Sequence, residues 1–160
     1  MKTFPKKNIS GFALVEILVA TSIITVTLLS VATIAQSSIK MSRRSLNASE
    51  ASYLVEEGAE AVKIIRDNAW SNISGLTNGT TYYLSYSGGT WSLSTTVSTI
   101  GIFTRTIVFS AVNRDSNDDI TSSGGTADTG TRLVTETVSW PDGSTTATKT
   151  LSLYIADIFS

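Results

Sequence analysis

Two groups of side chains in this chain could do chemistry, and the first is a single carboxylate. Glu16 is the only ionisable residue between Lys7 and Lys40. It lies near the start of an apolar run that covers residues 12–39, with only small polar interruptions. A carboxylate in a membrane-length segment costs roughly 2.5–3.5 kcal/mol on insertion, so such residues usually have a partner and a role. Glu16 is therefore the first candidate functional residue.

The second group is an acidic stretch in the C-terminal half of the chain. Asp115, Asn117 and Asp119 alternate as the oxygen ligands of a calcium-binding loop do, and Asp128 follows nearby. These four residues are candidate calcium ligands. The stretch is not an EF-hand, because the turn glycine and the acidic twelfth ligand are both missing. An acidic, solvated loop explains the same residues without a metal, and both interpretations stay open.

The composition argues against an enzyme and against a nucleic-acid-binding protein. The 160 residues include no His and no Cys, which removes the commonest general base, the usual zinc ligands and any thiol nucleophile. No glycine-rich phosphate loop or nucleophile elbow is present. A net charge of −1 and a pI near 5.3 do not suit binding to nucleic acid. We expect no enzymatic activity, no cofactor apart from the candidate calcium ion, and no nucleic-acid partner.

The residues around Glu16 form a short, ordered motif. A lysine pair at residues 6–7 precedes Gly11, which is followed directly by Phe12, and Glu16 is the fifth residue counted from Phe12. This arrangement resembles the class III signal of type IV pilins and pseudopilins. The resemblance implies that a prepilin peptidase cuts after Gly11 and that the new amine of Phe12 is N-methylated. It also implies that Glu16 neutralises this amine, on the same or an adjacent subunit, inside a filament.

The resemblance divides the chain into three parts. Residues 1–11 are expected to be a leader peptide, residues 12–39 a transmembrane and filament-core helix, and residues 40–160 an outer domain. Two features depart from the family pattern. Without Cys, the disulfide that closes a C-terminal loop in many pilins cannot form. Residues 25–33 contain none of the Gly or Pro that many pilins carry in mid-stem, so a loosening of the helix on assembly is not implied.

A single long helix is predicted from the stem into the outer domain. Neither Gly nor Pro occurs between Phe12 and Gly58, so nothing in that segment must break a helix. After Lys40 the pattern becomes amphipathic. The apolar stripe consists of Leu54, Ala61, Val62 and Ile65. Gly58 falls inside the stripe and allows a close approach of the backbone or a slight bend. We expect the helix to end near Asn68.

Alternating and β-branched sequences predict an antiparallel sheet in the rest of the chain. The expected strands cover residues 80–86, 90–95, 103–112, 132–140 and 146–155. Gly88-Gly89 and Pro141-Asp142-Gly143 are turn signals between pairs of them. Such a sheet needs cover for its apolar face, and the stripe on the helix supplies it. The expected fold class is α+β, a long N-terminal helix laid on an antiparallel sheet, which is also the layout of pilins.

The favoured function is that of a structural subunit, a minor pilin of a type IV pilus. The expected partners are other pilin subunits in a helical filament, the prepilin peptidase, and the assembly platform with its ATPase. The expected location is the inner membrane, as a single-pass protein, and then the extracellular filament. The alternatives are a pseudopilin of a type II secretion system and a membrane-tethered β domain that binds surfaces or glycans. An ordinary secretory signal, cut before Gln36, is a further reading of the N-terminus.

Overall fold

The computed structural model describes residues 10–158. The chain falls into two compact units, with the boundary between Arg44 and Ser45. Helix α1, Ser10–Asn68, runs through this boundary and ends where the sequence predicted. Residues 1–9, which make up most of the expected leader, lie outside the described part of the chain.

In the first unit, α1 presents apolar side chains on all sides. Every large apolar side chain from Phe12 to Ile39 is exposed. The helix reaches a mean hydropathy of 2.3 over 18 residues, and none of that window is buried. By length and composition, α1 could therefore cross a membrane.

Small polar residues interrupt this apolar surface, and their hydroxyl groups are bonded within the helix. Thr25 donates to the carbonyl of Thr21 at 2.8 Å, and Thr33 donates to the carbonyl of Leu29 at 2.9 Å. A bond to a carbonyl three or four residues back is also made by Thr21, Ser22, Thr27 and Ser30. A polar group without a partner costs several kcal/mol in hydrocarbon. These hydroxyl groups avoid that cost, because each one has its acceptor inside the same helix.

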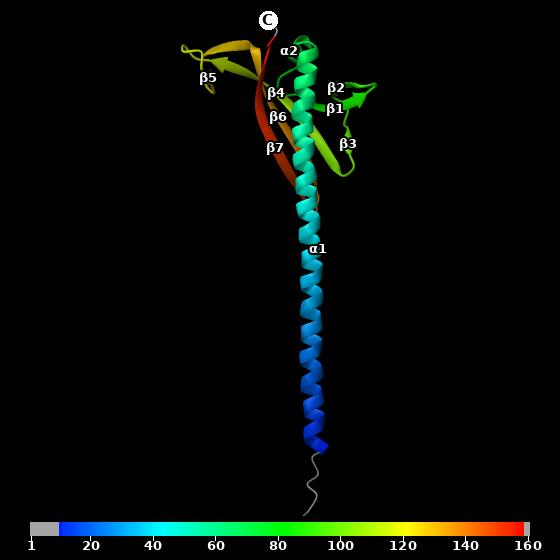
Figure 1. The fold of residues 1–160 in the computed structure, drawn as a ribbon. Helices are drawn as coiled ribbons and strands as arrows, with labels where there is room; N and C mark the ends of the chain where they lie inside the picture. The colour runs from blue at the N-terminus through cyan, green and yellow to red at the C-terminus, as the bar shows by residue number, and fades with distance from the viewer. Residues whose placement is uncertain (1–9, 159–160) are drawn as a thin grey trace, which may run out of the picture. The chain divides into compact units, whose positions relative to one another are not determined.

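The second unit is an antiparallel sheet whose one face is covered by the C-terminal part of α1 (Figure 1). The strands are β1 Thr81–Ser87, β2 Thr90–Ser94, β3 Thr99–Ile100, β4 Phe103–Arg114, β5 Ile120–Thr121, β6 Thr126–Asp142 and β7 Thr145–Ala156. The main path of the sheet runs β2-β1-β4-β6-β7, and the short strands β3 and β5 pair with β4. A one-turn helix, α2 Ser71–Ser74, follows α1. The α+β class predicted from the sequence is confirmed.

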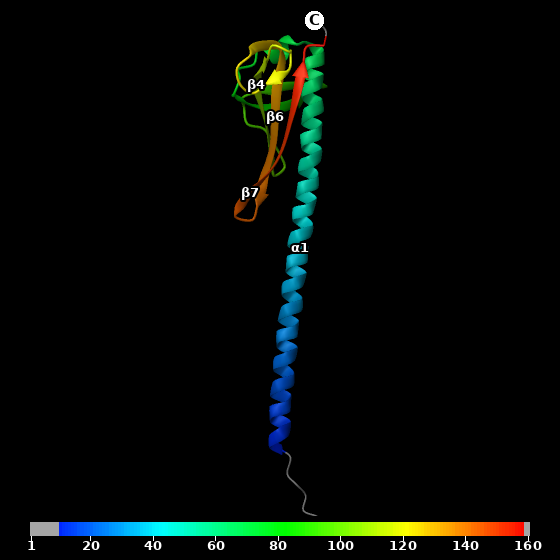
Figure 2. The ribbon, with the colours of Figure 1, turned by 90° about the vertical axis from the view of Figure 1, so that its left-hand side faces the viewer.

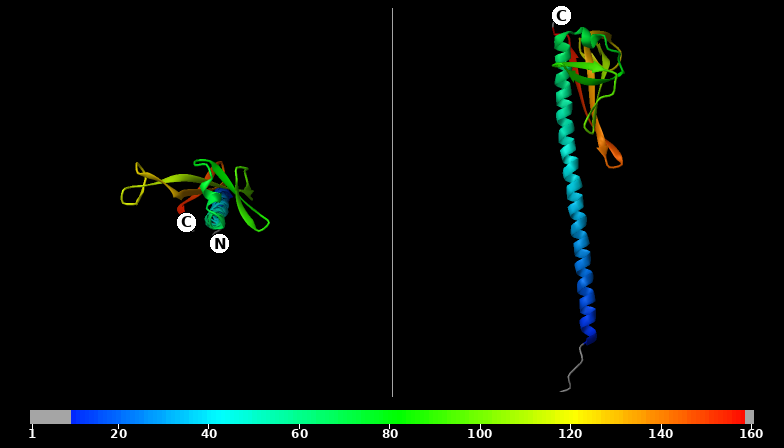
Figure 3. Two further views of the ribbon diagram at one scale, coloured as in Figure 1. Left: turned by 90° about the horizontal axis from the view of Figure 1, so that it is seen from above. Right: turned by 90° about the vertical axis from the view of Figure 1, so that its right-hand side faces the viewer.

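The two faces of the sheet differ in character. Strands β6 and β7 run lengthwise beside α1, as Figure 2 shows, and the view from above in Figure 3 places α1 on one side of the sheet. The opposite face carries pairs of hydroxyl groups across neighbouring strands. Thr135 lies 3.3 Å from Ser152, and Thr137 lies 3.1 Å from Thr150. The sheet is therefore apolar toward the helix and polar toward the other side, as expected for a sheet with one buried face.

The five predicted strands are confirmed, and the loop expected around the acidic residues is confirmed in part. Strand β4 continues to Arg114, β5 covers Ile120–Thr121 and β6 begins at Thr126, so half of residues 113–130 belong to strands, whereas Asp115, Asn117 and Asp119 lie in the turn between β4 and β5. The register places Asn113 opposite Ala127, after an irregularity between Ala111 and Val112. The many Asp, Asn, Ser and Gly residues indicated a loop, and strand pairing overrides those local preferences only at the flanks, including residues 126–130.

Two clusters of buried apolar residues form the core between α1 and the sheet. The upper cluster contains Ala61, Val62, Ile65, Ile73, Tyr82, Leu84, Ile107, Phe109, Val134 and Ile155. The lower cluster contains Ala51, Val55, Phe103, Val138 and Trp140. Both are built from residues of one phase on each strand and from one stripe on the helix.

The predicted stripe on the helix is confirmed in part. Ala61, Val62 and Ile65 are buried, whereas Leu54 is only half-buried, and Ala51 and Val55 complete the stripe. On β7, which is an edge strand, Ile155 is buried, Leu153 is half-buried and Leu151 is exposed.

Candidate functional site

The residues of the predicted processing and assembly site lie at the start of α1. Gly11, Phe12 and Glu16 belong to the first turns of the helix. Phe12 and Glu16 lie four residues apart, so they share one face. Their side chains are exposed and line a shallow groove of about 500 Å³ together with Val15, Val19, Ala20 and Ile23. The carboxylate therefore lies on an otherwise apolar surface.

The four candidate calcium ligands do not converge on one point. The Asp115 carboxylate accepts hydrogen bonds from the backbone N–H groups of Asn117 at 2.8 Å and Asp119 at 3.0 Å. Asp128 instead accepts a hydrogen bond from Arg114 Nε at 2.7 Å. Within residues 10–158, no three acidic, His or Cys side chains are placed to hold a metal ion. The calcium site stays a prediction, and the geometry gives it no support.

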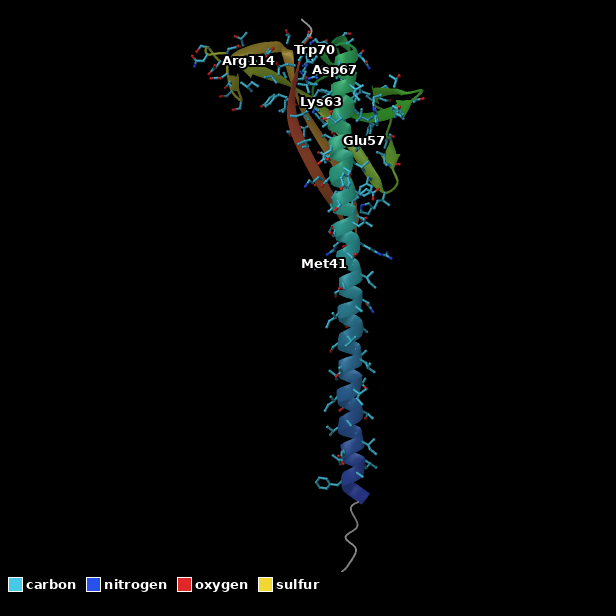
Figure 4. All side chains as sticks on the ribbon, in the orientation of Figure 1. Met41, Glu57, Lys63, Asp67, Trp70 and Arg114 are labelled. Carbon is cyan, nitrogen blue, oxygen red and sulfur yellow. The ribbon has the colours of Figure 1, made fainter. Side chains whose placement is uncertain are left out.

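The ion pair between Arg114 and Asp128 organises this end of the sheet. Figure 4 labels Arg114 near β5, away from α1. The hydrogen bond from Arg114, followed by one from Thr131, lowers the pKa of the Asp128 carboxyl group. The guanidinium group also donates to the carbonyl oxygen of Asp118 at 2.7 Å. Arg114 thus does for Asp128 what a bound cation would do.

A second group of charged residues, which the sequence analysis missed, lies inside the core. Arg105 on β4 is 4% exposed, and Glu136 on β6 is fully buried. Glu136 stands between Val134 of the upper cluster and Val138 of the lower cluster on the same strand. We call Glu57, Gly58, Arg105 and Glu136 the polar layer, because they separate the two apolar clusters.

Arg105 connects the sheet to the helix within the polar layer. Its Nη1 donates to Glu57 Oε2 at 2.8 Å and to the backbone carbonyl of Leu54 at 2.9 Å. Its Nε lies 3.9 Å from Glu136 Oε1, too far for a hydrogen bond. Arg105 Nε and both carboxylate oxygens of Glu136 have no hydrogen-bond partner in the described part of the chain.

Burial dominates the ionisation of Glu136. Loss of solvent raises the pKa of its carboxyl group from 4.5 to about 8, while nearby Arg105 lowers it and Glu57 raises it. Glu136 is therefore mainly protonated at pH 7. A neutral carboxylic acid is far cheaper to bury than a carboxylate, which explains how the group is tolerated between two apolar clusters.

Gly58 makes room for this buried side chain. A Cβ atom at residue 58 would lie 1.8 Å from Glu136 Oε1 and 2.4 Å from its carboxyl carbon. The close approach predicted at Gly58 is confirmed, and the neighbour is a side chain of the sheet. A displacement of the helix by one turn would place Glu136 against a residue with a side chain, so the polar layer fixes the position of this part of α1 on the sheet.

A signal for the polar layer is present in the sequence. Arg105 shares the strand phase of Phe103 and Ile107, and Glu136 shares that of Val134 and Val138. A charged residue in the buried phase of a strand indicates a buried polar contact.

The described residues define an α+β protein with a long apolar N-terminal helix and an antiparallel sheet. The helix is long and apolar enough to cross a membrane. No family model, curated protein or solved structure matches the chain. The features that bear on function are the stem motif around Glu16, the ion pair between Arg114 and Asp128, and the polar layer.

Proposed function

We propose that this protein is a structural subunit of a type IV pilus, a minor pilin that is processed after Gly11 and assembles through its apolar stem. The observation that carries the proposal is the position of Glu16. It is the fifth residue from Phe12, it lies on the same face of an unbroken helix, and apolar side chains surround it.

The physical basis is the pairing of two charges in apolar surroundings. Cleavage after Gly11 creates a free amine at Phe12, which stays cationic after methylation. An isolated charge in a water-poor core is costly, whereas an opposite charge at hydrogen-bond distance makes both tolerable. Glu16 meets the amine of its own helix through the four-residue spacing, or the amine of an adjacent subunit.

The proposed role implies an order of steps for the subunit. It first resides in the inner membrane with the stem as its single span, and the prepilin peptidase removes the leader there. The stem then leaves the lipid and packs against other subunits in a helical filament. The energy comes from the ATPase of the assembly platform, since this sequence carries no phosphate-binding loop of its own.

The outer domain supports the assignment to a minor subunit. A long helix laid on an antiparallel sheet is consistent with the pilin layout. The domain has no Cys and is rich in Gly and Thr, unlike the disulfide-closed domains of many pilins. Strand pairing and the ion pair between Arg114 and Asp128 hold the region that a disulfide would otherwise close.

The N-terminus of the mature protein tests the processing step. Mass spectrometry of protein isolated from its own host is expected to find N-methylated Phe12 as the first residue. An intact Met1 would instead indicate a membrane-tethered protein that does not assemble, and a chain that begins at Gln36 would indicate a secreted one. Either result would overturn the proposal.

A carboxylate substitution tests the assembly step. Glu16→Ala is expected to lower the amount of this subunit in sheared filaments by about tenfold or more, because the terminal amine loses its partner. Glu50→Ala removes an exposed carboxylate from the same helix outside the apolar run and serves as the matched control. Equal incorporation of both variants, at equal levels in the membrane, would contradict the role of Glu16.

A further inference from the structure

A pocket of about 650 Å³ opens beside the polar layer in the sheet unit. Its walls come from α1, from the β1–β2 hairpin and from the segment that precedes β4. The polar and aromatic side chains that line it are those of Glu57, Ser85, Tyr86, Trp91, Ser98 and Arg105. A volume of this size lies within the range of small-molecule sites, roughly 300–1,000 Å³.

The aromatic side of the pocket consists of two rings that lie opposite each other on the hairpin. Tyr86 pairs with Trp91 across β1 and β2, and their ring centroids lie 4.9 Å apart at an angle of 49°. The Tyr86 side chain is 61% exposed, although its strand phase is that of the buried residues Tyr82 and Leu84. An aromatic ring thus stays uncovered at the mouth of a cavity.

The charged side of the pocket is fixed in place. The carbon at the centre of the Arg105 guanidinium group lies 5.6 Å from the centroid of the Trp91 ring. Arg105 is 4% exposed and its Nε has no hydrogen-bond partner in the described part of the chain. Glu57, whose side chain is 50% exposed, pairs with Arg105 and keeps much of its surface open. Figure 4 labels Glu57 on α1.

These charges restrict the chemistry of a ligand. The single positive charge of Arg105 is balanced by the carboxylate of Glu57, because protonated Glu136 adds no charge. Because these two charges balance, neither an anion nor a cation gains a net electrostatic attraction at the pocket. A wholly apolar ligand would remove water from this ion pair without replacing its hydrogen bonds. The pocket therefore suits a neutral molecule with hydroxyl groups and one apolar face, which is the chemistry of a pyranose ring.

We propose that this pocket binds a neutral oligosaccharide. The exposed ring of Tyr86 and the edge of Trp91 contact the C–H face of a sugar. The Glu57 carboxylate accepts hydrogen bonds from its hydroxyl groups, and Ser85 and Ser98 serve as further polar contacts at the rim. Binding of a saccharide goes beyond the proposed role in a filament and does not depend on it, since every residue of the pocket belongs to the sheet unit.

The test uses the detergent-solubilised full chain, in a detergent without a sugar headgroup, and a panel of trisaccharides. Maltotriose, cellotriose and N-acetylchitotriose are the neutral probes, and sialyllactose is the anionic probe. Binding is measured by isothermal titration calorimetry and by the change in tryptophan fluorescence. We expect at least one neutral probe to bind with a millimolar or lower dissociation constant, and sialyllactose to bind more weakly.

Two exposed tyrosines provide a matched pair of variants. Tyr86→Ala is expected to weaken binding of that neutral probe by about tenfold, through loss of an aromatic contact. Tyr154→Ala removes a side chain that is 52% exposed on β7, outside the pocket, and leaves binding unchanged. Circular dichroism verifies that both variants are folded. Trp91→Phe keeps an aromatic ring and is expected to weaken binding less than Tyr86→Ala does.

Three results would overturn the proposal. The first is that no neutral probe binds at millimolar concentration. The second is that Tyr86→Ala and Tyr154→Ala weaken binding equally. The third is that sialyllactose binds more tightly than every neutral probe, which would make the pocket an anion site. None of these results bears on the cleavage after Gly11, so this proposal and the filament proposal fail independently.

Discussion

Two glutamates of this protein lie in apolar surroundings, but one is exposed and the other is buried. Glu16 lies on the surface of the apolar helix, where its side chain is exposed and open to a partner from outside. Glu136 is fully buried between two apolar clusters, and its carboxyl oxygens have no hydrogen-bond partner in the described residues. The first carboxylate suits assembly with another charge, and the second is accommodated inside one domain.

The difference shows that an acidic residue in an apolar segment has two distinct physical solutions. A carboxylate that stays ionised needs an opposite charge close by, as we propose for Glu16. A carboxyl group that keeps its proton avoids the larger cost of a buried charge, although its unpaired oxygens still carry a smaller one, and Gly58 supplies the space for Glu136. Pairing with an opposite charge is the solution that we propose for Glu16, and a retained proton is the solution for Glu136.

The largest expected effect is a dependence of stability on pH that comes from Glu136. The group titrates near 4.5 in the unfolded chain and near 8 in the folded one, because burial raises its pKa. Between these values the folded state retains a proton that the unfolded state has lost, so the free energy of unfolding falls as the pH rises. The slope is about 1.4 kcal/mol per pH unit, and the total between pH 5 and pH 8 is on the order of 4 kcal/mol.

Urea unfolding of the solubilised full chain, followed by tryptophan fluorescence from pH 5 to pH 8, measures this slope. Glu136→Gln replaces the protonated acid by a neutral group of similar shape and is expected to remove most of it. Glu56→Gln changes an exposed carboxylate and is expected to leave it in place. An unchanged slope in Glu136→Gln would break the comparison, because Glu136 would then be ionised in the folded protein.

The second-largest effect is a change in stability when the space beside Gly58 is filled. Gly58→Ala places a Cβ atom against the Glu136 carboxyl group, and overpacking of this kind costs about 1–3 kcal/mol. Ala otherwise favours a helix by up to about 1 kcal/mol over Gly. The substitution is therefore expected to destabilise the wild-type chain and to stabilise a Glu136→Ala chain. Thermal unfolding of the four proteins of this cycle measures the change of sign, and a stabilising effect in both backgrounds would show that the carboxyl group moves away freely.

The smallest effect concerns Asp128, whose carboxyl group is paired rather than protonated. Its pKa is lowered by Arg114, so its contribution to stability is present above its ordinary pKa of 3.8 and is lost as the pH falls through the folded value. This sign is the opposite of that for Glu136. Asp128→Asn is expected to lower the melting temperature at pH 7 by only about one to three degrees, since partly exposed ion pairs contribute little. A loss as large as that caused by Gly58→Ala would contradict this reasoning.

Much of the fold could be predicted from the sequence, because its signals are local. The absence of Gly and Pro up to Gly58 indicated a continuous helix, and the end at Asn68 is confirmed. Alternating residues and glycine turns indicated the five main strands. Gly88 and Gly89 have φ values of 59° and 81°, which a tight hairpin requires and which other residues rarely adopt.

The strand phase signals that Arg105 and Glu136 are buried, but their partners in the polar layer could not be predicted, because these depend on contacts between distant parts of the chain. Nothing near Glu136 in the sequence shows that Gly58 lies opposite it, or that the loss of solvent there is complete. The same limit applies to Asp128, which was grouped with Asp115 by proximity in sequence. In the structure, the pairing of β4 with β6 places Arg114 beside Asp128, and the two side chains form an ion pair.

The hydroxyl groups of the stem have a consequence for the transfer of this helix between environments. Thr25, Ser30 and Thr33 donate to carbonyl groups of their own helix, so they require nothing from the surrounding medium. The apolar surface of this helix can therefore contact lipid chains or the side chains of neighbouring proteins at nearly the same free energy. A helix of this kind can exchange one for the other without exposing an unsatisfied donor along the way, and the charge pair that we propose between Glu16 and the Phe12 amine would then be the main polar feature that differs between lipid and filament.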